Sequence, residues 1–469
     1  MSFEIGSLTG SPRCRNSDYG PIQRRSSSDS SRTAGSRAST DVPSKDRCRT
    51  ERGCAMSNEK LFVIVGGGLA GAKTAEQLRA RDFPGRILLL GEEKHLPYER
   101  PPLSKDYFAG KKQLAEFTVQ HGDWYRDHRV EVELGVTVTA LDPGAHTVTL
   151  PDGSTVRYDK LALATGSRPR RILLPGIDAA GVHMLRTVEQ SDALLAAVRR
   201  DEGPAPRLAI VGAGWIGLEI AAGARGHGAD VTVVEAAAQP LSGALGEQMG
   251  AVFADLHRSH GVDLRLSTTV SEILTVEGRA TGLRLGDGTE IRADAVLVAV
   301  GAQPNVELAR DAGLTVASDG VAVDASLATS DPDIVAVGDI AAAEHPLLRT
   351  RIRVEHWANA LNQPDVAAAT MLGRPASYDR LPYFFTDQYD LGMEYVGHAP
   401  AEARVITRGD VGSRQFLAFW LDAAGRVRAG MNVNIWDAGD DIRALISSGE
   451  SVDPHRLSDP QVPLAEVAG

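Results

Sequence analysis

The chain has 469 residues, a net charge of −11, 43% hydrophobic residues and 48 glycines. This length is sufficient for two or three domains with sizeable cores, whereas no apolar run approaches the roughly 20 residues that a membrane-spanning helix needs. The acidic balance argues against binding to nucleic acid. We therefore predict a soluble, cytoplasmic protein with no membrane or nucleic-acid partner.

Residues 1–55 differ in composition from the rest of the chain. They are rich in Ser and Arg and contain all three cysteines, Cys14, Cys48 and Cys54. Such a segment buries too little apolar surface to offset its ordering entropy, so we predict a disordered extension over residues 1–56. It lacks the apolar core of a secretory signal, and its six acidic residues are untypical of a mitochondrial transit peptide. We expect translation to start at Met56.

A first glycine motif follows directly on an apolar, strand-type run at residues 61–65. The motif reads Gly66-Gly67-Gly68-Leu69-Ala70-Gly71 and precedes a predicted helix at residues 73–81. Glycines at this place let the backbone approach a pyrophosphate at a helix N-terminus. A predicted strand at residues 86–90 ends at Glu92, where a carboxylate accepts hydrogen bonds from ribose hydroxyls. The whole unit predicts a dinucleotide site.

The segment between the two glycine motifs begins with a loop at residues 96–105, which is punctuated by prolines. Short strands at residues 146–150 and 155–158 are joined by a predicted turn at residues 151–154. A further strand, at residues 160–164, leads into Thr165 and Gly166. A helix is expected at residues 191–200.

The second glycine motif repeats the arrangement of the first. A strand at residues 208–211 leads into Gly212-Ala213-Gly214-Trp215-Ile216-Gly217, and a helix (219–228) and a strand (230–234) follow, ending at Glu235. Two such units indicate electron transfer between two nucleotides. Residues 236–238 are all Ala, so no cation follows Glu235 to pair with a 2′-phosphate, and the carboxylate would repel one. We predict NADH as the cofactor of this unit rather than NADPH.

The second half of the chain partly repeats the first. A strand at residues 295–300 leads into Gly301, as residues 160–164 lead into Thr165, and a strand at residues 334–337 leads into Gly338 and Asp339. From about Pro382 the sequence becomes richer in aromatic residues with alternating apolar positions, which predicts a third, mostly β domain.

Several of these motifs, in this order, resemble the FAD-dependent, NADH-using ferredoxin reductases, which include putidaredoxin and rubredoxin reductases and the reductase components of Rieske dioxygenases. Besides the glycine motifs, the resemblance rests on residues 98–105, 164–166, 337–339, 356–360 and 385–390. It implies an α/β fold of two Rossmann-like domains, as in glutathione reductase, and a C-terminal α+β domain. The implied boundaries are 57–172 and 302–380 for the FAD domain, 173–301 for the NADH domain and 381–469 for the C-terminal interface domain.

The resemblance also implies which residues bind the cofactors. The first motif would hold the FAD pyrophosphate and Glu92 its ribose, while the second motif would hold the NADH pyrophosphate and Glu235 its ribose. The implied FAD contacts are Gly66, Gly68, Leu69, Ala70, Gly71, Glu92, Lys105, Val138, Arg186, Asp339 and Trp357, with Asp339 accepting from a ribityl hydroxyl. Further implied cofactor contacts are Ala164, Thr165, Gly166, Gly301 and Gly338. The implied NADH contacts are Gly212, Gly214, Trp215, Ile216, Gly217 and Glu235. No metal site is predicted.

Two charged residues are implied as catalytic. Lys105 is expected near the flavin N5, and Glu219 is expected to pair with it when the nicotinamide arrives, because a cation there stabilises the negative charge that reduction places on the ring. Phe385, expected near Trp357, is the candidate residue for docking of the electron acceptor near the flavin edge, and a plain core position in an alternating strand stays open. A solvated strand edge is favoured for the alternating Arg349, Arg351 and Arg353, although a basic docking patch for an acidic ferredoxin stays open.

Three functions remain open from the sequence. The favoured one is transfer of electrons from NADH to a ferredoxin that serves a cytochrome P450 or a Rieske oxygenase. The others are an NADH-dependent reductase of a small acceptor, such as monodehydroascorbate or oxygen, and an NADH-sensing flavoprotein similar to apoptosis-inducing factor. Residues 55–469 contain no cysteine, so a thiol relay of the kind used by related disulfide reductases is excluded.

Overall fold

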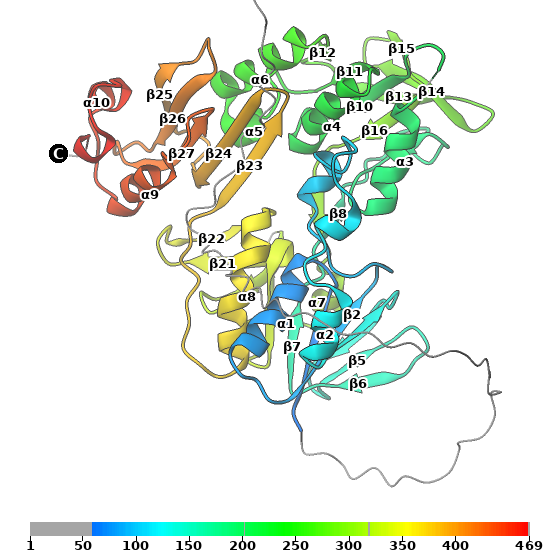
Figure 1. The fold of residues 1–469 in the computed structure, drawn as a ribbon, viewed down its shortest axis with the longest axis vertical. Coiled ribbons are helices and arrows are strands. Elements are labelled where there is room, and N and C mark those ends of the chain that lie inside the picture. Colours follow the sequence, from blue (N-terminus) through cyan, green and yellow to red (C-terminus); the bar gives the residue numbers. More distant parts are fainter. Residues whose placement is uncertain (1–58, 201, 318, 468–469) are drawn as a thin grey trace, which may run out of the picture. The chain divides into compact units, whose positions relative to one another are not determined.

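The computed structural model describes residues 59–200, 202–317 and 319–467 (Figure 1). The predicted extension at residues 1–56 lies outside these ranges. Among the described residues, no helix is both long and apolar enough to cross a membrane.

The first glycine motif lies at the end of a central strand in a five-stranded parallel sheet of order β20-β7-β1-β2-β3. The strand β20 pairs with β7 although its residues lie 173 positions further along the chain (Ile334 opposite Leu161), so the chain returns to this sheet, as the resemblance implies. Helices α1 and α8 pack against each other beside the sheet (Figure 1). The bounds are β1 Leu61–Val65, α1 Leu69–Ala80, β2 Arg86–Gly91, β3 Val130–Leu134, β7 Lys160–Leu163, β20 Ile334–Ala336 and α8 Trp357–Met371.

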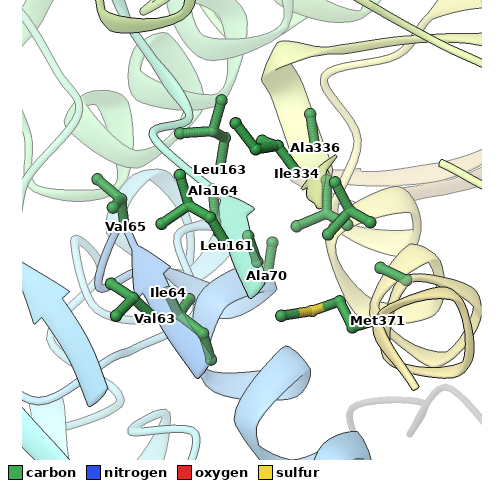
Figure 2. Close-up of a cluster of buried hydrophobic side chains, with 14 of the residues drawn as sticks. Val63, Ile64, Val65, Ala70, Leu161, Leu163, Ala164, Ile334, Ala336 and Met371 are labelled. Atoms are coloured by element: carbon green, nitrogen blue, oxygen red, sulfur yellow. The ribbon is translucent and has the colours of Figure 1, made fainter. Parts of the chain in front are cut away.

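The core below the first motif is made of aliphatic side chains. Figure 2 shows Ile64 of β1 and Leu161 of β7 close to Ile334 of β20, and Met371 at the end of α8 on the same cluster. These residues are 3% exposed or less. Strands that are buried on both faces read as continuous apolar runs, and for this reason residues 61–65 and 160–163 were recognisable from sequence.

The second glycine motif has the same place in a second parallel sheet, of order β12-β11-β10-β16-β9. A three-stranded antiparallel sheet, β13-β14-β15, accompanies it. The bounds are β9 Val182–His183, α3 Val188–Val198, β10 Arg207–Val211, α4 Trp215–Gly226, β11 Asp230–Val234, α5 Ser242–Leu245, α6 Glu247–Ser259, β12 Asp263–Arg265, β13 Val270–Val276, β14 Arg279–Leu285, β15 Glu290–Arg292 and β16 Ala295–Val298.

The C-terminal part is a five-stranded antiparallel sheet of order β23-β24-β27-β26-β25, which is followed by helices α9 and α10 (Figure 1) and a short last helix, η4. Its bounds are β23 Tyr383–Gln388, β24 Leu391–Gly397, β25 Arg404–Asp410, β26 Gln415–Leu421, β27 Val427–Val433, α9 Gly439–Ser448, α10 Pro454–Ser458 and the short helix η4 Leu464–Glu466. The aromatic, alternating pattern from residue 382 onward therefore predicted this part correctly as mostly β.

The remaining elements are short. They are the helices η1 Pro101–Ser104, η2 Leu114–Glu116, α2 Gly122–Asp127, α7 Glu307–Asp311 and η3 Gly338–Ile340, and the strands β4 Ala140–Asp142, β5 Thr147–Thr149, β6 Thr155–Arg157, β8 Ser167–Pro169, β17 Ala302–Pro304, β18 Val316–Ala317, β19 Gly320–Val323, β21 Ala341–His345 and β22 Thr350–Arg353.

Three helices begin earlier than the sequence predicted. Helices α1 and α4 begin at the residue after Gly68 and Gly214, which are their N-caps, so the last glycine of each motif already lies inside a helix. Helix α3 begins after Thr187, whose hydroxyl accepts from the backbone N–H of Gln190 in a capping box. The shift matters for function because it places the N-terminus of each long helix within its glycine motif.

Candidate cofactor and electron-transfer site

In the first motif, two glycines are required by the protein itself. Gly66 has a φ of +124°, and a Cβ on it would lie 2.1 Å from the carbonyl oxygen of Ala164. A Cβ on Gly71 would lie 2.0 Å from the carbonyl oxygen of Gly66. Gly68 is different, because its φ of −92° is open to any residue and a Cβ there would meet no atom within 4 Å. Apart from the modest advantage of glycine over alanine as the N-cap of α1, no contact inside the protein requires Gly68, whereas a pyrophosphate held against the N-terminus of α1 would require it.

The second motif has the same geometry. A Cβ on Gly212, whose φ is +103°, would lie 2.4 Å from the carbonyl oxygen of Ala299, and one on Gly217 would lie 2.2 Å from that of Gly212. Gly214, with a φ of −79°, again faces space that no protein atom fills within 4 Å. Two loops therefore each leave the same gap in front of a helix, and this arrangement fits two dinucleotides.

A cavity of about 900 Å³ extends from the first motif to the C-terminal sheet. Most of the predicted FAD contacts line it, together with both predicted catalytic residues and Phe385. The predicted residues that line it are Gly66, Gly68, Leu69, Ala70, Glu92, Lys105, Val138, Ala164, Thr165, Gly166, Arg186, Trp215, Ile216, Glu219, Gly338, Asp339, Trp357 and Phe385.

The other predicted residues lie outside this cavity. Gly71 is buried against the Gly66 carbonyl, and Gly301 is exposed. Gly212, Gly214 and Gly217 form the second motif at the end of β10, and Glu235 follows β11 beside it. The carboxylate of Glu235 accepts from the backbone N–H groups of Ala213 (2.7 Å) and Ala237 (2.9 Å). The residue that is predicted to bind the NADH ribose is therefore hydrogen-bonded to the second glycine motif.

Asp339 is a buried carboxylate of the cavity with two side-chain donors. It follows β20 and is 8% exposed. Its Oδ2 accepts from the Ser167 hydroxyl at 2.6 Å and from Nη2 of Arg186 at 2.7 Å. Burial acts to raise the pKa of Asp339, but the charge of Arg186 and these hydrogen bonds outweigh it and hold the pKa below its ordinary value. The residue therefore presents an ionised acceptor, as hydroxyl binding requires.

Two buried nitrogens that line the cavity have no hydrogen-bond partner among the described residues: Nδ1 of His356 and Nε of Arg186. Burial lowers the pKa of His356 to about 4, so its ring is neutral near pH 7. Buried polar atoms rarely stay unpaired. These two nitrogens therefore fit a polar ligand in the cavity.

Sequence reasoning did not identify the group that holds Arg186 in place. Nη1 of Arg100 donates to the carbonyl oxygen of Arg186 at 2.5 Å, and its Nη2 donates to Glu93 at 2.6 Å. The Tyr98 hydroxyl donates to Glu93 and accepts from the backbone N–H of Val188 at 3.1 Å. Tyr98 and Arg100 belong to a motif on which the resemblance rests, and this motif was a usable signal. The contact of Arg100 with Arg186, 86 residues further along the chain, could not be predicted from the sequence.

Lys105 and Glu219 form an ion pair in this structure, and their predicted pairing on arrival of the nicotinamide stays a prediction. Nζ of Lys105 donates to Oε1 of Glu219, which is 7% exposed, and the hydroxyl of Ser104 donates to Oε2 at 2.5 Å. The hydroxyl of Thr386, from β23, donates to Oε1 at 2.7 Å. The carboxylate, which belongs to helix α4, thus connects the end of η1 with the C-terminal sheet. Sequence reasoning missed both hydroxyls.

Phe385 lies close to Trp357, as predicted. Their ring centroids are 6.2 Å apart in an edge-to-face arrangement, and Nζ of Lys105 lies 5.6 Å from the centroid of Phe385. Both aromatic residues line the cavity. They connect the cavity wall at the start of α8 with the first residues of β23.

The arginines near residue 350 do not form a free basic patch. Arg351 pairs with Glu344 at 2.6 Å, and Arg353 pairs with Glu355 at 2.5 Å and Asp319 at 3.0 Å. Arg349 precedes β22 with a φ of +53° and so does not continue the alternation of the strand. The geometry favours the solvated edge. The described residues also contain no cluster of His, Cys, Asp and Glu that could hold a metal ion.

Residues 60–363 match a family model described as pyridine nucleotide-disulphide oxidoreductase. The chain belongs to this family. Residues 383–468 of the reductase match a second model, described as reductase C-terminal.

The reductase is 42% identical over 407 residues to the anthranilate 1,2-dioxygenase system ferredoxin–NAD(+) reductase component of Burkholderia cepacia, covering 86% of this chain and 98% of the relative. It is 36% identical to putidaredoxin reductase of Pseudomonas putida, covering 88% and 97%. The covalent putidaredoxin reductase–putidaredoxin complex matches with a TM-score of 0.82 and 35% identity, covering 87% of this chain and 98% of the other. These matches confirm the predicted family, its fold class, and an oxidoreductase that uses FAD and NAD(H).

Proposed function

We propose that this reductase takes hydride from NADH and passes electrons singly to a small iron–sulfur ferredoxin, which serves a cytochrome P450 or a Rieske oxygenase. Two relatives named as ferredoxin–NAD(+) reductase components of dioxygenase systems, and a third named putidaredoxin reductase, support this function. The observation that carries it is the pair of glycine loops, each with an unfilled gap at Gly68 or Gly214, beside one large cavity.

FAD, when bound, supplies the conversion of one hydride into electrons that leave one at a time. The residues of the chain bind and orient it. In the proposal the first motif receives the FAD pyrophosphate, Glu92 the adenosine ribose and Asp339 a ribityl hydroxyl, while the second motif and Glu235 receive NADH. The domain boundaries implied by the resemblance are part of the same proposal.

Lys105 has an electrostatic role in this proposal. Its ammonium group is held at the cavity wall by Glu219, so positive charge is present where hydride transfer adds negative charge, and no group has to reorganise at that moment. Glu219 keeps the lysine in place and balances its charge in a site that is largely shielded from water.

Electrons leave, we propose, through the edge formed by Phe385 and Trp357. The reductase has no cysteine in residues 55–469 that could take them from the cavity, so the acceptor has to approach the cavity itself. We further propose a cytoplasmic location, where NADH is supplied by metabolism.

Reduction of cytochrome c by NADH, measured with and without an added [2Fe–2S] ferredoxin, tests this function. Turnover that depends strictly on the ferredoxin is the expected result. Fast turnover without ferredoxin would favour the small-acceptor reductase instead. Slow turnover with a long-lived complex between NAD+ and the reduced protein would favour an NADH sensor.

A further inference from the structure

A row of buried hydrogen bonds leads away from Glu219 and is not used by the function described above. The hydroxyl of Thr386 contacts Glu219 at 2.7 Å and Nε2 of Gln388 at 3.2 Å. Oε1 of Gln388 lies 2.8 Å from Nε2 of His257, and Nδ1 of His257 lies 3.4 Å from the hydroxyl of Tyr389. Thr386, Gln388 and His257 are each 1% exposed or less.

The Glu219 carboxylate at one end of this row determines which group donates in each hydrogen bond. An ionised carboxylate only accepts, so Thr386 gives its single hydrogen to Glu219 and has to accept from the side-chain amide of Gln388. The carbonyl oxygen of Gln388 then faces His257, whose Nε2 must carry the hydrogen.

The far end of the row is consistent with this direction. Burial lowers the pKa of His257 to about 4, so the ring is neutral near pH 7 and its Nδ1 is free to accept from the Tyr389 hydroxyl. All donors therefore point toward Glu219. Hydrogen bonds aligned in this way polarise one another and strengthen the last member, which acts on the carboxylate.

The row connects elements that are distant in the sequence. His257 belongs to α6 and Glu219 to α4, both next to the second glycine motif, whereas Thr386 and Gln388 belong to β23 of the C-terminal sheet. Burying one of these polar side chains without a partner would cost free energy of folding. Because all of them are paired in one row, they instead fix one relative placement of helix α4 and strand β23. Phe385 is the neighbour of Thr386 on the same strand.

We propose that Thr386, Gln388 and His257 are positioning residues, which hold the Glu219 carboxylate against Lys105 and so set the charge that the flavin ring experiences. This inference rests on the proposed function, in which Lys105 lies beside that ring. None of the three residues lines the cavity, so they act through Glu219 rather than on a ligand.

The test compares Thr386→Val, which removes the hydroxyl at nearly constant volume, with Thr386→Ser, which keeps it. Both are prepared as FAD-loaded enzymes. Thr386→Val is expected to slow the limiting rate of flavin reduction by NADH by roughly tenfold, the factor associated with one hydrogen bond to a charged group, and to shift the midpoint potential of the flavin. Thr386→Ser is expected to retain the wild-type rate and potential. A wild-type rate and potential in Thr386→Val would overturn the proposal.

Gln388→Met is the second variant, because it removes the amide while keeping an unbranched side chain of similar length. It should shift the flavin potential in the same direction as Thr386→Val. If Thr386→Val does not retain FAD, the comparison of Gln388→Met with wild type decides the question alone, and an unchanged potential in it refutes the positioning role.

A double-mutant cycle separates positioning of Glu219 from a general packing role. In the Glu219→Gln background, Thr386→Val should lower the thermal unfolding temperature less than it does in wild type, because the charged acceptor is gone. Strictly additive losses would contradict the inference. Failure of the proposed function would give a different result. NADH would still reduce the flavin of the wild-type protein, but turnover would not depend on added ferredoxin, and this outcome does not depend on the behaviour of the variants.

Discussion

The unexplained glycines of the two motifs make the sharpest prediction. Gly68→Ala should leave the stability of the protein almost unchanged and weaken the binding of FAD. The φ of −92° suits alanine, and the new methyl group would meet no protein atom within 4 Å. Any loss of binding therefore reports on something outside the protein that approaches the backbone at this point.

The expected magnitudes follow from the same geometry. Alanine is a poorer N-cap residue than glycine, which costs less than about 1 kcal/mol. A methyl group that holds a phosphate away from the helix N-terminus removes at least one hydrogen bond to a charged group, about 1.5–3 kcal/mol, so the Kd for FAD should rise by at least about tenfold. Gly66→Ala should instead destabilise the fold, because its φ of +124° costs on the order of 1–3 kcal/mol for a non-glycine residue and its Cβ overlaps the Ala164 carbonyl.

Titration of FAD-free protein with FAD, followed by flavin fluorescence, and thermal unfolding of the same samples measure both effects. Gly226→Ala is the matched control, since its Cβ also meets no atom within 4 Å but it lies at the far end of α4. Normal FAD affinity in Gly68→Ala, with normal stability, would refute the assignment of the first motif. Gly214→Ala should raise the KM for NADH while FAD stays bound.

Three further predictions concern charge, pH and electron exit. Lys105→Met should slow flavin reduction by NADH by about a hundredfold, and an unchanged stopped-flow trace would count against its electrostatic role. The pKa of His257 is about 4 in the folded protein and near 6.5 in the unfolded chain, so the unfolded chain takes up the proton first as the pH falls. The contribution of neutral His257 to the free energy of unfolding is therefore complete above about pH 6.5 and is lost as the pH falls toward 4. Its size is roughly 3 kcal/mol. Urea unfolding at several pH values should show a shallower acid dependence for His257→Gln than for wild type. Phe385→Leu should slow electron transfer to ferredoxin more than flavin reduction by NADH, and equal slowing of both steps would argue against Phe385 as the exit.

The parts of the fold that could be predicted from sequence are those whose cause is local. Gly71 is required by the carbonyl oxygen of Gly66 in the same motif, and Gly66 by its own φ of +124°, and the buried strands read as apolar runs. The helix starts were placed too late for an equally local reason: the last glycine of a motif was assigned to the loop, whereas Gly71 and Gly217 are the third residue of their helices.

The contacts that complete the site could not be predicted, because their partners are distant in the sequence. Glu219 and Thr386 are separated by 167 residues, and Ser104 and Glu219 by 115. No periodic pattern in the sequence indicates which acceptor a hydroxyl on a strand or in a loop will contact. The resemblance identified the lysine and the glutamate as a pair, but only the packing of β23 against α4 shows that the carboxylate has further donors.

The side chains that donate to Glu219 bear on how electrons could leave the cavity without a cysteine in residues 55–469. The segment before Lys105 forms η1 and ends with Ser104, whose hydroxyl donates to the Glu219 carboxylate. A buried acid at this place suits a cation that remains charged, not a thiol that cycles between oxidation states. Lys105 in turn lies over Phe385. In the proposed function this places a cation, held by a buried carboxylate, between the cavity and the aromatic edge where an external acceptor would approach, and single-electron transfer to that acceptor then needs no thiol.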